Sequence, residues 1–89
     1  MQKKTVTIIN KLGLHARAAG KLVDTAQRFS SRTELGYKDK TINAKSIMAV
    51  MMLGAAKHAE LEITTDGDDE ESALEAIEAL IANRFGEKQ

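Results

Sequence analysis

A histidine and an arginine stand where the pattern of an apolar strand changes into the pattern of an amphipathic helix. His15, one of only two histidines among 89 residues, lies two places after Gly13 and two places before Arg17. A residue at a helix start lies beside backbone N–H groups that have no acceptor inside the helix. These free donors and the helix dipole together attract anions. The combination predicts a site that can accept and hold a phosphoryl group.

Each group at this junction has its own chemical part. The positive end of the helix disfavours imidazolium, so we expect His15 to be a neutral nucleophile. Arg17 offers a planar, permanently charged fork that suits phosphate oxygens. The backbone N–H groups of Ala16, Arg17 and Ala18 are the expected phosphate donors. A purely structural alternative stays open, in which His15 caps the helix and Arg17 is a solvated first-turn charge.

A second stretch, residues 47–53, is apolar on every side, which a short surface helix does not need. A serine before it and Gly54 after it are typical start and stop signals, so Ser46 is a predicted N-cap. We expect Val50 and Leu53 to enter the core. Exposed apolar surfaces usually mark partner sites, and methionines adapt well to partners. The predicted partner contacts on this helix are Ile47, Met48, Met51 and Met52.

Hydrophobic periodicity predicts seven elements in the order β-α-β-β-α-β-α. Alternating apolar residues indicate strands, and one apolar stripe with helical spacing indicates a helix. The first helical stripe runs through Ala19, Leu22, Val23, Ala26 and Phe29, with Thr25 on another face. The last helix is expected to include Phe85 and to close near Gly86. Strands with one apolar face and helices with one stripe favour an open sandwich within a single domain, residues 1–89.

Composition excludes several classes of protein. The chain has 13 basic and 13 acidic residues, no cysteine and three aromatics, so neither nucleic-acid binding nor disulfides are expected. Nothing approaches the ~20 apolar residues of a membrane span, and we expect a cytoplasmic protein without membrane insertion. His58 has no second ligand at metal-binding spacing, so no metal site is predicted. The acidic run at 66–71 reads as a turn that complements a helix dipole.

Two motifs, GLHARAA at 13–19 and NAKSIMAVMML at 43–53, resemble those of HPr, the histidine-containing phosphocarrier family of the bacterial phosphotransferase system. The resemblance implies an open-faced β-sandwich, a four-stranded antiparallel sheet covered on one face by three helices. It implies that enzyme I phosphorylates His15 on Nδ1, that an enzyme IIA component receives the group, and that Arg17 supports it. Ser46 matches a serine that an HPr kinase/phosphorylase modifies in some lineages. The family's docking surface maps to Leu14, Ala19, Gly20, Ile47, Met48 and Met51.

The resemblance also implies a monomeric carrier without cofactors rather than an enzyme. An alternative is a mainly regulatory module of the same fold, serving a nitrogen branch or catabolite control through protein contacts. One position departs from the family, which usually has proline where this chain has Ala18. Alanine keeps an N–H group that proline lacks, so Ala18 is expected to add a donor to the phosphoryl site.

Overall fold

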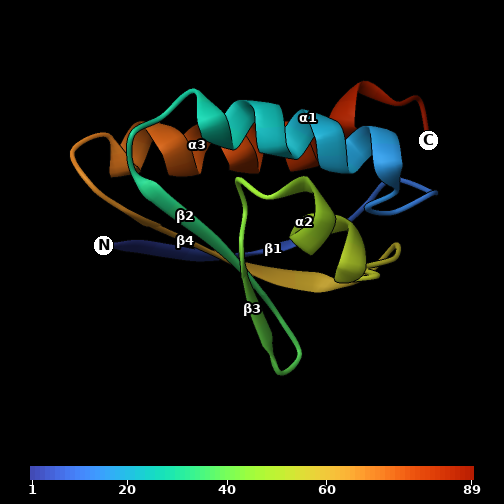
Figure 1. Ribbon diagram of the computed structural model, residues 1–89. Helices are drawn as coiled ribbons and strands as arrows, with labels where there is room; N and C mark the ends of the chain where they lie inside the picture. The colour runs from blue at the N-terminus through green and yellow to red at the C-terminus, as the bar shows by residue number, and fades with distance from the viewer.

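The computed structural model describes residues 1–89 and shows an antiparallel sheet with helices on one face (Figure 1). The predicted order of elements is confirmed, with one short 3₁₀ helix added near the end of the chain. The elements are β1 (Gln2–Thr7), α1 (Ala16–Gln27), β2 (Arg32–Tyr37), β3 (Lys40–Asn43), α2 (Ile47–Met52), β4 (Glu60–Asp66), α3 (Glu70–Ala82) and η1 (Arg84–Gly86).

The four strands lie in the order β1-β4-β2-β3, and all three pairings are antiparallel. In the two central strands every second residue is buried because it faces the helices, while the residues between them face away. Leu35 of β2 pairs with Ile63 of β4, and both are fully buried. The core consists of Ile8, Leu14, Ala18, Ala19, Leu22, Val23, Ala26, Leu35, Ala44, Val50, Leu53, Ala55, Leu61, Ile63, Ile77, Ile81 and Phe85.

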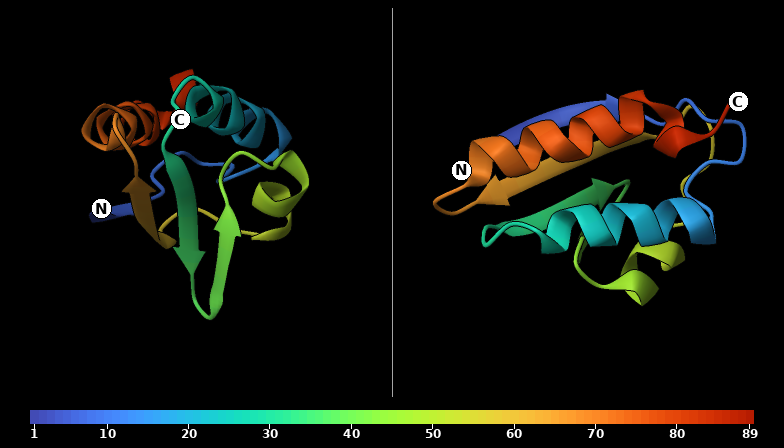
Figure 2. Two further views of the ribbon diagram at one scale, coloured as in Figure 1. Left: turned by 60° about the vertical axis from the view of Figure 1, so that its left-hand side comes forward. Right: turned by 90° about the horizontal axis from the view of Figure 1, so that it is seen from above.

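Helices α1 and α3 lie side by side on the sheet and run in opposite directions (Figure 2). Their apolar stripes meet the same core, as the periodicity predicts. Two details of the α1 prediction are wrong. Thr25 is buried, and Phe29 lies beyond the helix and is only half-buried, because α1 ends at Gln27. No helix combines the length and the apolar character needed to cross a membrane.

The last helix ends earlier than predicted, and the reason is a left-handed turn. Helix α3 stops at Ala82, after which Arg84 and Phe85 both have φ of 55° and Gly86 has φ of 80°. Phe85 is still fully buried, but it reaches the core from η1 rather than from α3. The turn redirects the backbone, and residues 87–89 pass beside the start of α1 (Figure 2).

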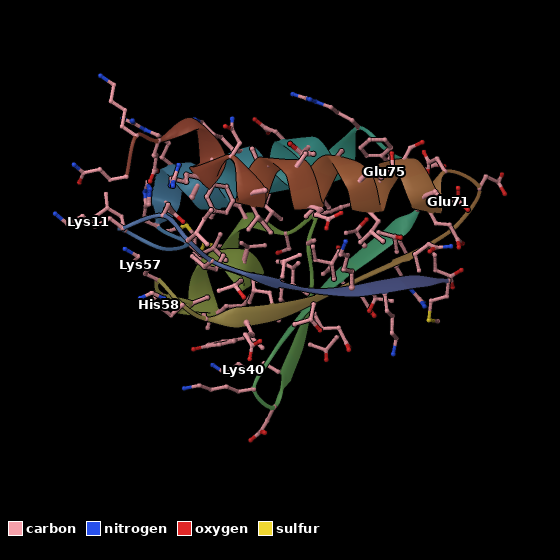
Figure 3. All side chains as sticks on the ribbon, turned by 180° about the vertical axis from the view of Figure 1, so that it is seen from behind. Lys11, Lys40, Lys57, His58, Glu71 and Glu75 are labelled. Atoms are coloured by element: carbon pink, nitrogen blue, oxygen red, sulfur yellow. The ribbon has the colours of Figure 1, made fainter.

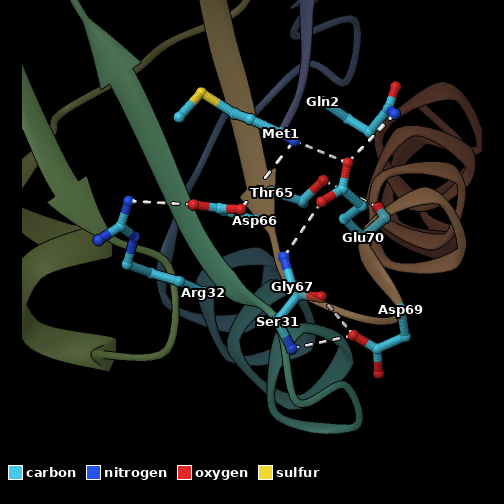
Figure 4. A network of polar contacts seen from close by, with 9 residues as sticks. All are labelled: Met1, Gln2, Ser31, Arg32, Thr65, Asp66, Gly67, Asp69 and Glu70. Carbon is cyan, nitrogen blue, oxygen red and sulfur yellow. Dashed lines mark hydrogen bonds and ion pairs between the residues drawn. The ribbon is translucent and has the colours of Figure 1, made fainter.

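A polar network closes the opposite end of the molecule, where β4 turns into α3 (Figure 4). Asp69 accepts hydrogen bonds from the backbone N–H groups of Ser30 and Ser31, each at 2.9 Å, and from the Ser31 hydroxyl. These bonds, the one from the Ser31 hydroxyl above all, lower the pKa of Asp69 to about 2. Glu70 accepts from Gly67 N at 3.2 Å and from the Met1 amino group at 2.9 Å. We call residues 30–31 and 66–70 with Met1 the polar clamp.

Candidate functional site

His15 occupies the N-cap position of α1, as predicted. Its backbone is extended, with φ of −77° and ψ of 179°, and its side chain makes no capping hydrogen bond. The first hydrogen bond within the helix runs from Ala19 N to His15 O at 2.8 Å. The N–H groups of Ala16, Arg17 and Ala18 therefore precede the helical ladder and have no carbonyl acceptor within it. Ala16 and Arg17 are exposed, so the structure leaves their N–H groups available to an anion, whereas Ala18 is fully buried.

The loop before His15 requires a glycine. Gly13 has φ of +66°, and a Cβ atom there would lie 2.7 Å from Ala56 Cα and 2.8 Å from Ala55 O. The next residue, Leu14, donates its N–H to Ala55 O at 2.9 Å. The segment after α2 therefore holds the loop closely and sets where His15 enters the helix.

An open hollow of ≈ 730 Å³ lies beside His15. It is lined by Lys11, Leu12, His15, Ala16, Arg17, Glu87, Lys88 and Gln89. Arg17 is exposed there, and Lys11 and Lys88 add two further positive charges. Figure 3 shows Lys11 and Lys57 at this end of the molecule and Glu71 at the other end of α3. Although the net charge is zero, the charge around the hollow favours an anionic ligand.

The structure adds a residue that sequence reasoning missed. Glu87 Oε2 lies in hydrogen-bonding contact with His15 Nε2, and the two side chains are 14% and 27% exposed. Asn10 Nδ2 donates to Glu87 Oε1 at 2.9 Å and to Gly13 O at 2.8 Å. The Asn10 amide, and to a lesser degree the His15 ring, lowers the pKa of Glu87, so this carboxylate is ionised at neutral pH. His15 and Glu87 are 72 positions apart, and no local pattern links them.

Ser46 is the N-cap of α2, as predicted, and its hydroxyl accepts a long hydrogen bond of 3.4 Å from Ala49 N. Val50 and Leu53 are buried, which confirms their predicted place in the core. The other large side chains of the helix are 40–72% exposed: Ile47, Met48, Met51 and Met52. We call these four residues the apolar patch. Since the chain after α2 packs against Gly13 and Leu14, the patch lies on the same side of the molecule as the start of α1.

Three residues of the predicted partner surface are less accessible than expected. Leu14 is 5% exposed and Ala19 is fully buried, so their side chains offer a partner little or no surface. The reason is that Ala19 lies on the α1 stripe that packs against the core and Leu14, in the loop before α1, belongs to the same core. Gly20 is half-buried. Ala18 is also fully buried, backbone included, so its N–H is less accessible than the predicted donor role needs.

Comparisons with known proteins agree with this geometry. A family profile described as "PTS HPr component phosphorylation site" matches residues 2–83. The phosphocarrier protein HPr of Cupriavidus necator is 51% identical over 87 residues and 98% of each chain. The phosphocarrier protein HPr of Pseudomonas aeruginosa is 51% identical over 83 residues and 92% of each chain. The crystal structure of HPr-C-His from Thermoanaerobacter tengcongensis superposes with a TM-score of 0.96 at 44% identity, covering both chains fully. The chain therefore belongs to the HPr family, the phosphocarriers of the phosphotransferase system.

Proposed function

We propose that His15 is the residue that carries the phosphoryl group, accepting it on Nδ1 from phospho-enzyme I and passing it to an enzyme IIA component. The observation that carries this proposal is the position of His15 as the N-cap of α1 with no side-chain cap of its own. The imidazole is only partly covered, so two different proteins can reach it in turn. Members of this family are carriers and not enzymes.

Arg17 and the first turn of α1 support the bound phosphoryl group. The backbone N–H groups of Ala16 and Arg17, two exposed residues, have no helical acceptor and lie at the positive end of the dipole. The guanidinium of Arg17 adds bidentate donors on the same turn. Phosphoryl transfer spreads charge over the equatorial oxygens, so positioned positive groups lower its barrier. The open hollow also leaves room for a partner to approach the phosphorus in line.

The test is phosphorylation with enzyme I and phosphoenolpyruvate, followed by measurement of the intact mass. We expect an acid-labile gain of one phosphate, which His15→Ala abolishes. His58→Ala is the matched control because His58, the other histidine, is exposed in a loop. An unchanged mass for the wild-type protein would contradict the proposal. If enzyme I still bound without phosphorylating the chain, a regulatory module would be the better reading.

We propose the apolar patch as the docking surface for both enzyme I and enzyme IIA. Met48 is 66% exposed and is the natural position to test. Met48→Asp should raise the KM of enzyme I for the carrier while the thermal midpoint stays close to that of the wild type. Ala79→Asp places the same charge on an exposed position of α3 and should leave the KM unchanged. Equal KM values for the two variants would exclude the patch.

We propose that phosphorylation of Ser46, by a kinase of the HPr kinase/phosphorylase type, weakens docking without unfolding α2. A phosphate at this N-cap would be tolerated by the helix but would place about two negative charges beside the apolar patch. Ser46→Asp should therefore reduce the rate of phosphoryl transfer from enzyme I at low carrier concentration. A rate equal to that of the wild type would exclude this mechanism. A monomeric state and a cytoplasmic location stay predictions.

A further inference from the structure

Two further side chains fix the position of the His15 ring: one contacts the ring, and the other orients the first. Glu87 Oε2 contacts His15 Nε2, and Glu87 Oε1 accepts from Asn10 Nδ2 at 2.9 Å. Asn10 is fully buried and uses its second amide proton on Gly13 O. This orientation leaves Asn10 Oδ1 buried and without a donor. If the Asn10 amide were turned over, both donated hydrogen bonds would be lost. The observed orientation leaves one acceptor unpaired but holds Glu87 and the loop before His15.

The backbone around Glu87 is also fixed, although it lies beyond the last helix. Left-handed conformations at Arg84 and Phe85 are costly for residues with a Cβ atom and persist only where the surroundings enforce them. Burial of Phe85 anchors the turn, and Lys21 Nζ donates to Phe85 O at 2.6 Å. Lys11 N donates to Gln89 O at 2.9 Å. Contacts on both sides of Glu87 therefore keep its carboxylate at the ring.

We propose that Glu87 is a positioning residue for phosphoryl transfer: its carboxylate, oriented by Asn10, keeps the proton of the neutral His15 ring on Nε2 and thereby presents Nδ1 as the nucleophile. An ionised carboxylate can only accept a hydrogen bond. A neutral imidazole has one N–H, and the partner of one nitrogen decides which nitrogen carries it. With Nε2 bound to Glu87, the lone pair lies on Nδ1. This inference rests on the proposed function of His15.

The same contact suits the charge that develops during transfer. The Nδ1 lone pair attacks the phosphorus of the donor protein, an N–P bond forms, and the bond from phosphorus to the donor's leaving atom breaks. The leaving atom keeps that electron pair. The His15 ring, still protonated on Nε2, now carries a positive charge that faces the Glu87 carboxylate. When an acceptor attacks the phosphorus, the N–P electron pair returns to Nδ1 and the ring is again neutral with its proton on Nε2.

Two substitutions of Glu87 separate this role from simple packing. Glu87→Ala removes the acceptor. Glu87→Gln keeps the shape, but Asn10 still donates, so the introduced carbonyl pairs with Asn10 and the introduced NH₂ group points at the ring. That NH₂ group donates to Nε2 and drives the ring proton to Nδ1, which removes the nucleophile. If Glu87 acted only by packing, Glu87→Gln would transfer the phosphoryl group faster than Glu87→Ala. If Glu87 controls the tautomer, Glu87→Gln transfers it more slowly than Glu87→Ala.

The first measurement is ¹⁵N NMR of the His15 ring, with no phosphoryl donor present and at a pH where the ring is neutral. We expect the proton on Nε2 in the wild type and a shift toward Nδ1 in Glu87→Gln. The second measurement is transfer from phospho-enzyme I. We expect kcat to fall by about 10-fold in Glu87→Ala and further in Glu87→Gln, with KM little changed, since partners that orient a reacting histidine are typically worth 10-fold or more.

Glu75→Gln is the matched control, because Glu75 is exposed on α3 and makes no side-chain hydrogen bond or ion pair. It should behave as the wild type in both measurements. A wild-type ring protonated on Nδ1, or a glutamine variant that transfers as fast as the alanine variant or faster, would overturn the inference. Failure of the proposed function looks different: the wild type would then gain no phosphate at all, whatever tautomer its ring adopts.

Discussion

Two helices of this protein begin at opposite ends of the molecule, and their first turns are treated in opposite ways. Helix α3 begins with Asp69, Glu70 and Glu71, so three carboxylates lie at its positive end. Asp69 and Glu70 also join the polar clamp, where they accept backbone and amino-group donors (Figure 4). Helix α1 has no acidic residue in its first turn, and neither helix has a side-chain hydrogen bond to cap its first N–H groups. The donors of α1 are left for an external anion.

The difference shows how one backbone feature serves either stability or function. Every helix N-terminus has unpaired N–H groups and a partial positive charge. At α3 three carboxylates offset that positive charge, and Asp69 also ties the start of α3 to the segment after α1 through Ser30 and Ser31. At α1 no acidic residue of the first turn offsets that charge, and His15 and Arg17 lie beside it. The carboxylate of Glu87, which lines the same hollow, contacts Nε2 of His15 instead of capping the helix.

The largest effect is expected from a substitution that gives α1 the acidic first residue of α3. Ala16→Glu copies the position of Glu70 and should slow phosphoryl acceptance by about 100-fold, the scale on which loss of positioned donors slows charged transition states. It should also raise the free energy of unfolding by about 0.5 kcal/mol through the helix dipole. Transfer assays and urea denaturation measure the two effects. Ala16→Gln is the neutral control, and equal transfer rates for the two variants would contradict the comparison.

Two glycines extend the comparison to the loops that hold each end. Gly13 precedes His15 at φ +66°, and Gly67 lies in the polar clamp at φ +155°, where a Cβ atom would come 2.8 Å from Ser31 Cα. Gly13→Ala and Gly67→Ala should each lower the free energy of unfolding by about 2 kcal/mol, a typical cost of backbone strain. Only Gly13→Ala should also slow phosphoryl transfer in the folded protein. Equal transfer losses in both variants would argue against separate roles for the two ends.

A smaller effect is expected at the third residue of α1. Ala18→Pro removes one of the free N–H groups and pre-sets φ in the first turn, which should raise the free energy of unfolding by about 0.5–1 kcal/mol. If the Ala18 N–H binds the phosphoryl group, the phosphohistidine should hydrolyse faster in the variant. Its lifetime can be followed by loss of the acid-labile phosphate. A longer lifetime in Ala18→Pro would count against the extra donor.

The smallest effect belongs to the polar clamp and appears only in acid. The pKa of Asp69 lies at about 2 in the folded protein, below its ordinary value of 3.8. A depressed pKa contributes stability above the ordinary value, and this contribution is lost as the pH falls from about 4 toward 2. Thermal midpoints of the wild type should therefore drop across this interval more steeply than those of Asp69→Asn. Parallel curves for the two proteins would show that the Ser31 contact adds no stability.

Much of this architecture follows from local patterns. Alternating residues predict the strands, helical stripes predict α1 and α3, and Ser46 with Gly54 predicts α2, whose cap the structure confirms. Exposure of the four residues of the apolar patch also follows, because a six-residue helix cannot bury every side. These features depend on residues within a few positions of one another, where spacing alone fixes which side chains share a face.

The sequence by itself determined the elements, the apolar stripes and the pairing of His15 with Arg17 at a helix start. Tertiary structure alone decided the strand order β1-β4-β2-β3, the burial of Leu14 and Ala19, and the arrival of Glu87 at the imidazole. Contacts between residues 72 positions apart depend on how the whole core packs. Here Phe85 is buried in the core from a left-handed turn at Arg84–Gly86, and the chain after this turn brings Glu87 to His15.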